Sequence, residues 1–152
     1  MKALALAKAL IERFEGFKKV LPSGMVEAYI DPVGVWTIGC GITGPDVKKG
    51  TRWTRAQCDE RLMEEIHKAF AGVVRASKVL AVDQVRAAAV TDFAFNLGVG
   101  AYQGSTLRRK VNERDWEEAG RQARRWVKAG GRTLPGLVLR REVEAVMLET
   151  GR

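Results

Sequence analysis

Three polar side chains in the N-terminal part of the chain are of types that take part in catalysis, and they stand at positions where catalytic groups are common. Glu15 stands at the predicted end of a first helix, Asp31 lies in a turn, and Thr37 follows within a glycine-rich stretch. Paired carboxylates are the residue types of general acid and base catalysis. Turns on a rigid base commonly carry functional groups, so this region is the candidate site of the chain.

Each of these residues also has an ordinary structural explanation. An aspartate in an Asp-Pro-x-Gly stretch most often hydrogen-bonds its own turn, and a glutamate near a helix C-terminus is most often solvated. A threonine in a strand most often serves only the strand. Taken one at a time, the three residues leave both interpretations open.

The first elements that must position these residues follow from the spacing of apolar side chains. Leu6, Leu10 and Phe14 recur every four residues, which predicts an amphipathic helix over residues 2–15. Beyond it, glycines punctuate short runs rich in Val, Ile, Tyr, Trp and Thr as far as Gly44. This texture predicts strands and turns rather than helices.

The rest of the chain returns to helical patterns with clear starting signals. Thr54-Arg55-Ala56-Gln57 matches a capping box and opens a helix that runs to about residue 76. Further N-cap signals and breaks predict helices from residue 83 to Gly98, from 105 to about 112, from 115 to about 129, and from 135 to about 151. The order predicts an α+β fold whose strands are confined to one small lobe.

Composition and charge limit the classes of partner. The 152 residues suffice for a core without disulfide support, and the composition excludes collagen, coiled coil and bulk disorder. Lys and Arg number 26 against 18 Asp and Glu, a net +8 that favours a polyanionic partner.

No run approaches the ~20 apolar residues of a membrane helix, so we expect no stable membrane insertion. Cys40 and Cys58 form no ligand motif and His67 stands alone, so we expect no metal and no cofactor.

Three blocks of sequence match the motifs of one family in order. The first is Glu15-Gly16 followed by Ala28-Tyr29-Ile30-Asp31-Pro32-Val33-Gly34-Val35-Trp36-Thr37-Ile38-Gly39-Cys40-Gly41. The second is Phe93 to Gly100 with Gly104-Ser105-Thr106-Leu107, and the third is Trp126 to Glu142. Together they resemble the bacteriophage-type lysozymes, glycoside hydrolase family 24, to which many phage endolysins belong.

The resemblance implies a lysozyme-like α+β fold that forms one catalytic domain over residues 1–152. A small β lobe over about residues 16–52 would be joined by a long helix to a helical lobe over about residues 77–152, which also takes in the N-terminal helix. Because the matched blocks span nearly the whole chain, we expect no separate wall-binding domain.

The resemblance also assigns roles residue by residue. Glu15 would be the general acid that protonates the leaving glycosidic oxygen. Asp31 would stay ionised, help to activate a water and stabilise oxocarbenium-like charge, and Thr37 would position that water. The family inverts the anomeric carbon, which implies a separation of about 6.5–9.5 Å between the carboxyl groups of Glu15 and Asp31, whereas about 5 Å would favour retention.

The chain departs from the family pattern at two points. Fifteen residues separate Glu15 from Asp31, a longer interval than the family has, so residues 20–25 are expected to bulge from the first strand pair. Glu27 lies inside this shifted register and is a fallback acid, but Glu15 is preferred because it keeps the Phe-Glu-Gly context at a helix end. Ile42 stands where many family members have a histidine.

Candidate binding residues come from the second and third blocks. Asn96 resembles the family position that carries an amide toward the cleft, where it would bond a sugar amide or hydroxyl, but it is equally well explained as a residue near a helix end. Arg140 or Arg141 would approach Glu15, or else be solvated or face the wall. The tryptophans are expected mostly in the core.

The implied activity is that of an endolysin. The enzyme would hydrolyse, with inversion, the β-1,4 bond between N-acetylmuramic acid and N-acetylglucosamine in peptidoglycan, and so lyse the host cell. The resemblance implies a monomer with no nucleic-acid partner. It implies that the protein waits in the host cytoplasm until a separate permeabilising protein, a holin, opens the inner membrane, and then acts on the periplasmic wall.

Other function classes remain open. The basic clusters at residues 108–110 and 124–125 would suit nucleic acid or an anionic membrane, although acidic residues interrupt them and no RNA-binding aromatic signature or zinc-finger spacing is present. A non-catalytic relative that only binds the wall, or a lytic transglycosylase that releases an anhydro product, would be distinguished only by assay.

Overall fold

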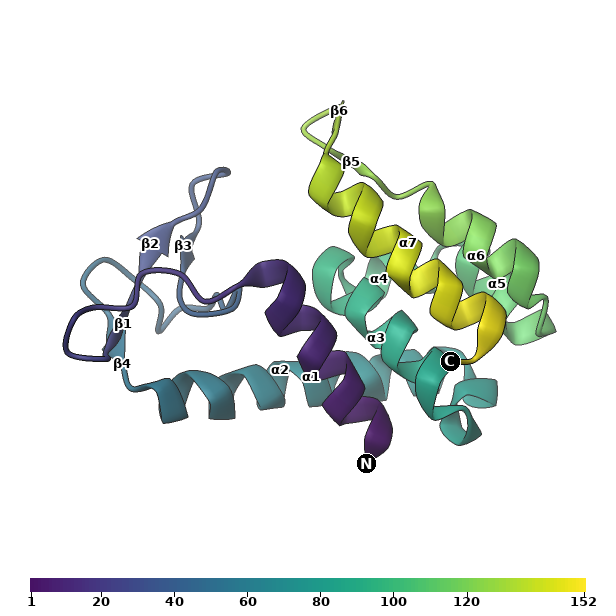
Figure 1. Cartoon of the computed structure of the whole chain (residues 1–152), viewed down its shortest axis with the longest axis horizontal. Coiled ribbons are helices and arrows are strands. Elements are labelled where there is room, and N and C mark those ends of the chain that lie inside the picture. The colour runs from purple at the N-terminus through teal and green to yellow at the C-terminus, as the bar shows by residue number, and fades with distance from the viewer. The chain divides into compact units, whose positions relative to one another are not determined.

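A computed structural model describes all residues from 1 to 152, and it divides into two compact units (Figure 1). We call Ile11–Glu65 the sheet unit, and Met1–Leu10 with Ile66–Arg152 the helical unit. Seven α-helices, one 3-10 helix and six two-residue strands confirm the predicted α+β class. The prediction that the strands are confined to one small lobe is wrong, because the last two strands form a hairpin in the helical unit.

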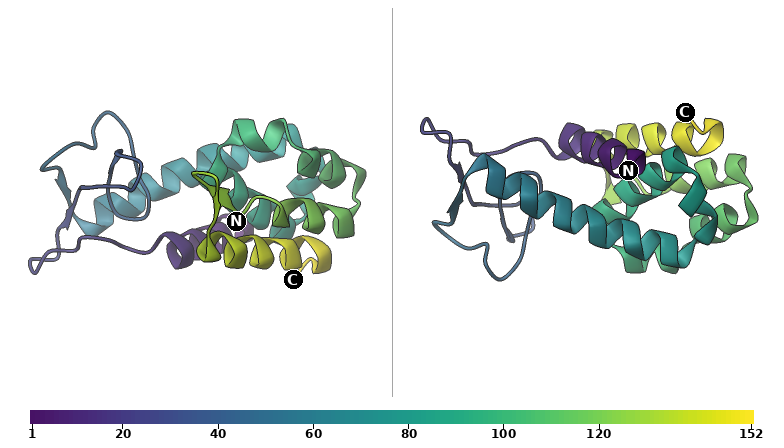
Figure 2. Two further views of the ribbon diagram at one scale, coloured as in Figure 1. Left: turned by 90° about the horizontal axis from the view of Figure 1, so that it is seen from above. Right: turned by 90° about the horizontal axis from the view of Figure 1, so that it is seen from below.

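The sheet unit holds four of the strands between parts of two helices. Helix α1 (Lys2–Glu15) ends in this unit and α2 (Arg55–Ala76) begins in it. Strands β1 (Val26–Glu27) and β4 (Arg52–Trp53) pair antiparallel, as do β2 (Tyr29–Ile30) and β3 (Trp36–Thr37). Most of the chain between α1 and α2 is turn and loop, as the two views of Figure 2 show.

The helical unit is built from helices that follow the C-terminal part of α2. They are η1 (Lys78–Val82), α3 (Gln84–Leu97), α4 (Val99–Gln103), α5 (Thr106–Glu113), α6 (Trp116–Arg124) and α7 (Pro135–Thr150). Helix α7 packs against both α3 and α6, and α6 also packs against α5. These contacts give the unit a helical core of its own.

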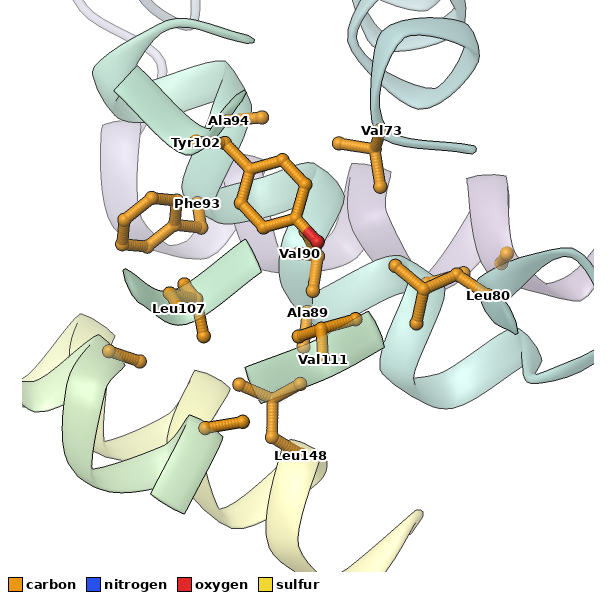
Figure 3. Close-up of a cluster of buried hydrophobic side chains, with 14 residues drawn as sticks. Val73, Leu80, Ala89, Val90, Phe93, Ala94, Tyr102, Leu107, Val111 and Leu148 are labelled. Carbon is orange, nitrogen blue, oxygen red and sulfur yellow. The ribbon is translucent and has the colours of Figure 1, made fainter. Parts of the chain in front are cut away.

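The centre of the helical unit is an apolar cluster around α3, shown in Figure 3. Phe93 on α3 stacks edge-on against Tyr102, with the two ring centroids 6.3 Å apart. The Tyr102 hydroxyl lies 2.7 Å from the Ser77 hydroxyl, so the buried phenol keeps a hydrogen-bond partner. Burial raises the pKa of Tyr102 to about 12, which keeps it neutral at every physiological pH.

Local capping explains why most helices begin where the sequence predicted. The Thr54 hydroxyl accepts from the Gln57 backbone N–H at 3.1 Å, and the Gln57 side chain accepts from the Thr54 N–H at 2.8 Å. This reciprocal pair confirms the predicted capping box. Asp83, Ser105 and Asp115 cap α3, α5 and α6 in the same way, each accepting a backbone N–H three residues on.

One predicted helix is too long. The sequence predicted a helix from residue 115 to about 129, but α6 ends at Arg124. The chain then turns back on itself as a hairpin of β5 (Lys128–Ala129) and β6 (Arg132–Thr133), closed by a bond from the Leu134 N–H to the Val127 carbonyl. Two glycines in the left-handed region make the tight turn at residues 130 and 131.

No helix of the chain combines the length and the apolarity needed to cross a bilayer.

Candidate active site

Glu15 is placed by the way α1 ends. Gly16 adopts φ +67° and its N–H closes the last turn on the Glu12 carbonyl at 3.1 Å, a geometry that favours glycine. The carboxyl of Glu15 then lies against the backbone of Gly41, where a Cβ added to the glycine would come within 3.2 Å of Glu15 Oε2. A side chain at position 41 would therefore crowd the carboxyl, so this glycine makes room for Glu15.

Asp31 opens the turn between β2 and β3. Its Oδ1 accepts from the N–H groups of Val33 at 2.9 Å and Val35 at 2.8 Å, and its backbone N–H donates to the Val35 carbonyl at 2.9 Å. The ordinary turn role of this aspartate is therefore present. Both side-chain bonds use Oδ1, so Oδ2 remains available to a water or a substrate.

Thr37 lies on β3, inside the same hairpin. The residue is 3% exposed, and its hydroxyl donates to the Val35 carbonyl at 3.0 Å. Because its single hydroxyl proton is used in this bond, the oxygen can only accept from a further partner. The same Val35 thus receives a bond from Thr37 and gives one to Asp31, which ties the two candidate residues to one turn.

Tyr29 is a site residue to which sequence reasoning gave no role. It is the cross-strand partner of Thr37, and the ammonium of Lys18 lies 5.6 Å from its ring centre. Burial first, and then the negative charges of Glu15 and Asp31, raise the pKa of the Tyr29 phenol. The signal present in the sequence was its position: Tyr29 precedes Asp31 by two residues in the glycine-rich stretch.

Glu27, the fallback acid, is held in its charged form. Its carboxylate pairs with Lys19 at 2.9 Å and with Arg52 at 3.0 Å. Hydrogen bonds from Lys19 and Arg52 lower the pKa of Glu27. A general acid needs the opposite, a carboxyl that keeps its proton near neutral pH.

The additional residues between Glu15 and Asp31 form a projecting turn, as predicted. The Leu21 N–H donates to the Met25 carbonyl at 2.8 Å, and Val20 bridges to Val26 across the turn. Residues 22–24 are exposed. The inserted residues therefore form the exposed tip of a hairpin.

The two arginines of the third block lie in the interior of the helical unit. Arg140 is 3% exposed, and its guanidinium donates two hydrogen bonds to the Asp92 carboxylate, at 3.0 and 2.7 Å. Arg141 is 0% exposed and donates hydrogen bonds to Glu144 and Asn96. The alternative that these arginines are solvated is therefore wrong. Asn96 lies half-buried near the end of α3.

The described side chains offer no place for a metal ion. No group of three His, Cys, Asp or Glu side chains converges on a common point. The candidate residues of the site offer two carboxyl groups, of Glu15 and Asp31, and the hydroxyl of Thr37.

Comparison with known proteins gives consistent matches along nearly the whole chain. A family model described as phage lysozyme matches residues 12–144. The SAR-endolysin of Enterobacteria phage PA-2 is 36% identical over 142 residues, which cover 93% of this chain and 85% of that protein. The solved muramidase domain of SpmX from Asticaccaulis excentricus matches with a TM-score of 0.79 at 28% identity, over 96% of this chain and 95% of that one. The solved endolysin from Escherichia coli O157:H7 phage FAHEc1 matches with a TM-score of 0.79 at 29% identity, over 99% of this chain and 91% of that one.

Proposed function

The chain belongs to the phage lysozyme family and is a lysozyme, and from this premise we propose that it is an endolysin of the muramidase type. It hydrolyses the β-1,4 bond between N-acetylmuramic acid and N-acetylglucosamine in peptidoglycan. The proposal is supported most by the placement of Glu15, whose carboxyl lies against the Gly41 backbone in the same unit as the Asp31 turn and Thr37.

In the proposed mechanism Glu15 is the general acid. It donates its proton to the glycosidic oxygen as the bond to the anomeric carbon breaks, and positive charge develops on the sugar ring. Asp31 remains ionised and stabilises that charge. The two backbone N–H groups that donate to its Oδ1 fix the orientation of the carboxylate.

Thr37 and Asp31 together hold the attacking water. The Thr37 oxygen, whose proton goes to Val35, accepts one hydrogen of the water, and Asp31 Oδ2 accepts the other. With both hydrogens held, a lone pair of the water is left to attack the sugar. Asp31 then takes the proton that the water releases.

We propose that the reaction inverts the anomeric carbon, with a carboxyl separation between Glu15 and Asp31 of about 6.5–9.5 Å. NMR of the first product formed from a soluble peptidoglycan fragment tests this. An α-anomer at the new reducing end is expected, a β-anomer contradicts inversion, and an anhydro sugar instead identifies a lytic transglycosylase.

The decisive experiment is Glu15→Gln in a turbidity assay on permeabilised Gram-negative cells. Loss of the general acid is expected to reduce lysis by about 10²–10⁴-fold. The matched control is Glu27→Gln, the same change in the same unit, which is expected to retain activity. If Glu15→Gln remains active and Glu27→Gln does not, the acid is Glu27, and an inactive parent protein contradicts the enzymatic proposal.

We further propose that the protein acts as a monomer and reaches the wall from the host cytoplasm after a holin permeabilises the inner membrane. The test is expression in a host cell without any other lysis protein. Cells are expected to stay intact until a membrane permeabiliser is added, and lysis by this protein alone contradicts the proposed route.

A further inference from the structure

Arg141 makes an unusually complete set of contacts for a buried arginine. Its Nε donates to the Trp126 carbonyl at 3.1 Å, one terminal nitrogen donates to the Glu144 carboxyl at 2.5 Å, and the other donates to Asn96 Oδ1. Its guanidinium also lies 4.9 Å from the centre of the Phe93 ring. A planar fork held on every side cannot turn, so the groups that it bonds are fixed with it.

The contact with Asn96 determines which way the side-chain amide points. A guanidinium has donors only, so the atom of Asn96 that faces Arg141 must be the oxygen. The amide nitrogen of Asn96 therefore points away from Arg141. It makes no hydrogen bond to the protein and is not among the buried atoms that lack a partner, so its two N–H groups are offered to solvent.

The surroundings of Arg141 hold this arrangement in place. Next to Arg141 in the sequence, Arg140 on α7 donates two hydrogen bonds to Asp92 on α3 and so joins the two helices. Trp126, whose carbonyl Arg141 holds, packs edge-on against Phe93 with ring centroids 5.5 Å apart and is still 36% exposed. One buried guanidinium thus holds both the Asn96 side chain and the backbone of Trp126.

We propose that Arg141 is a positioning residue that presents the Asn96 amide as a pure hydrogen-bond donor, so that the helical unit recognises an acceptor oxygen on the substrate. The chemical class is an amide carbonyl, which peptidoglycan carries both in its N-acetyl groups and in its peptides. This inference rests on the proposed function, because it takes peptidoglycan as the ligand.

The test measures binding to purified insoluble peptidoglycan in the Glu15→Gln background, where hydrolysis does not interfere. Asn96→Asp keeps an oxygen for Arg141 but loses both N–H donors, and it is expected to weaken binding about tenfold, the value of one good hydrogen bond. Its melting temperature is expected not to fall, because a carboxylate beside Arg141 adds an ion pair. The matched control, Asn112→Asp, makes the same charge change at an exposed helical position and is expected to bind normally.

The same measurement on glycan strands freed of peptide by an amidase distinguishes the two sources of the carbonyl. A tenfold loss on both substrates identifies the N-acetyl group, and a loss on intact peptidoglycan alone identifies a peptide carbonyl. Unchanged binding of Asn96→Asp on both substrates contradicts the inference and leaves the proposed function standing. No binding by the Glu15→Gln protein itself contradicts the proposed function, and the inference falls with it.

Arg141→Lys separates positioning from simple stability. Lysine keeps the charge but lacks the fork, so the Asn96 amide is free to turn. In the otherwise unchanged enzyme, this variant is expected to raise KM for soluble peptidoglycan about fivefold, with kcat within twofold of the parent. The double variant that combines Arg141→Lys with Asn96→Asp is expected to have the same KM as Asn96→Asp alone. Additive losses, or a fall in kcat alone, contradict the positioning role.

Discussion

The sheet unit carries the candidate catalytic residues yet almost no net charge, whereas the helical unit carries all of the positive surplus. Residues 11–65 hold 8 Lys and Arg against 9 Asp and Glu, a net −1. The remaining residues hold 18 Lys and Arg against 9 Asp and Glu, a net +9. The overall +8 is therefore a property of one unit and not of the protein as a whole.

The two units also differ in the ion pairing and the pKa values of their carboxyl groups. Every Asp and Glu of the helical unit takes part in an ion pair, so the unpaired charges at its surface are cations. Burial and the neighbouring Asp92 raise the pKa of Glu144, while solvent-exposed cations lower that of Glu27 in the sheet unit. We propose that the helical unit supplies the attraction to a polyanionic wall and that the sheet unit carries the residues that cleave the bond.

The largest effect on stability is expected from the buried arginine of the helical unit. Arg140→Met leaves the carboxylate of Asp92, which is 0% exposed, without its bidentate partner. Breaking such a buried pair is expected to cost about 3–5 kcal/mol of unfolding free energy, measured by urea denaturation. Lys110→Met, which breaks an exposed pair with Glu113, is the control and is expected to cost less than about 1 kcal/mol. If Arg140→Met and Lys110→Met lower the free energy of unfolding equally, the buried pair of Arg140 and Asp92 does not stabilise this unit.

Next to the loss expected from Glu15→Gln, the largest effect on activity is expected in the sheet unit, at Thr37. Thr37→Val keeps the shape of the side chain but removes the acceptor for the water, and it is expected to reduce kcat about a hundredfold through lost orientation. Thr37→Ser keeps the hydroxyl and is expected to retain most of the activity. If the Val and Ser variants lyse cells equally well, Thr37 does not hold the water.

A smaller effect is expected from removing surface cations. Lys128 and Arg132 lie exposed on the β5–β6 hairpin without a carboxylate partner, and their double change to Gln is expected to slow lysis about threefold at low salt. The difference from the parent is expected to vanish near 1 M salt, where the Debye length is about 3 Å. Lys48 and Lys49 of the sheet unit, changed in the same way, provide the matched control. An equal loss from both pairs would contradict the division of roles between the units.

The smallest effect is expected from the pH dependence of the Glu27 pairs. Because the pKa of Glu27 is lowered from 4.5 in the folded protein, its contribution to stability is present above that value and is lost as the pH falls through the lowered pKa. The melting temperature of the parent is expected to exceed that of Glu27→Gln at pH 7 and to converge with it in acid. A difference that grows as the pH falls contradicts this sign.

Most of the helix starts were predictable because their causes are local. Thr54 and Gln57 cap one another within a single turn, and Asp83 and Ser105 act on backbone groups three residues away. The end of α6 was not predictable in this way. The apolar and charged pattern continues to Ala129, and the bond between Leu134 and Val127 that turns the chain back belongs to no helical pattern.

The sequence by itself determined the family, the α+β class and the three candidate residues, because these depend on residue types at fixed spacing along the chain. Only the tertiary structure decided the environment of each group. Gly41 makes room for Glu15, Arg52 holds Glu27 in its charged form, and Arg141 orients Asn96, each from a distant part of the chain. The physical reason is that hydrogen bonding, ion pairing and desolvation act through space, whereas a motif records only the order of residues.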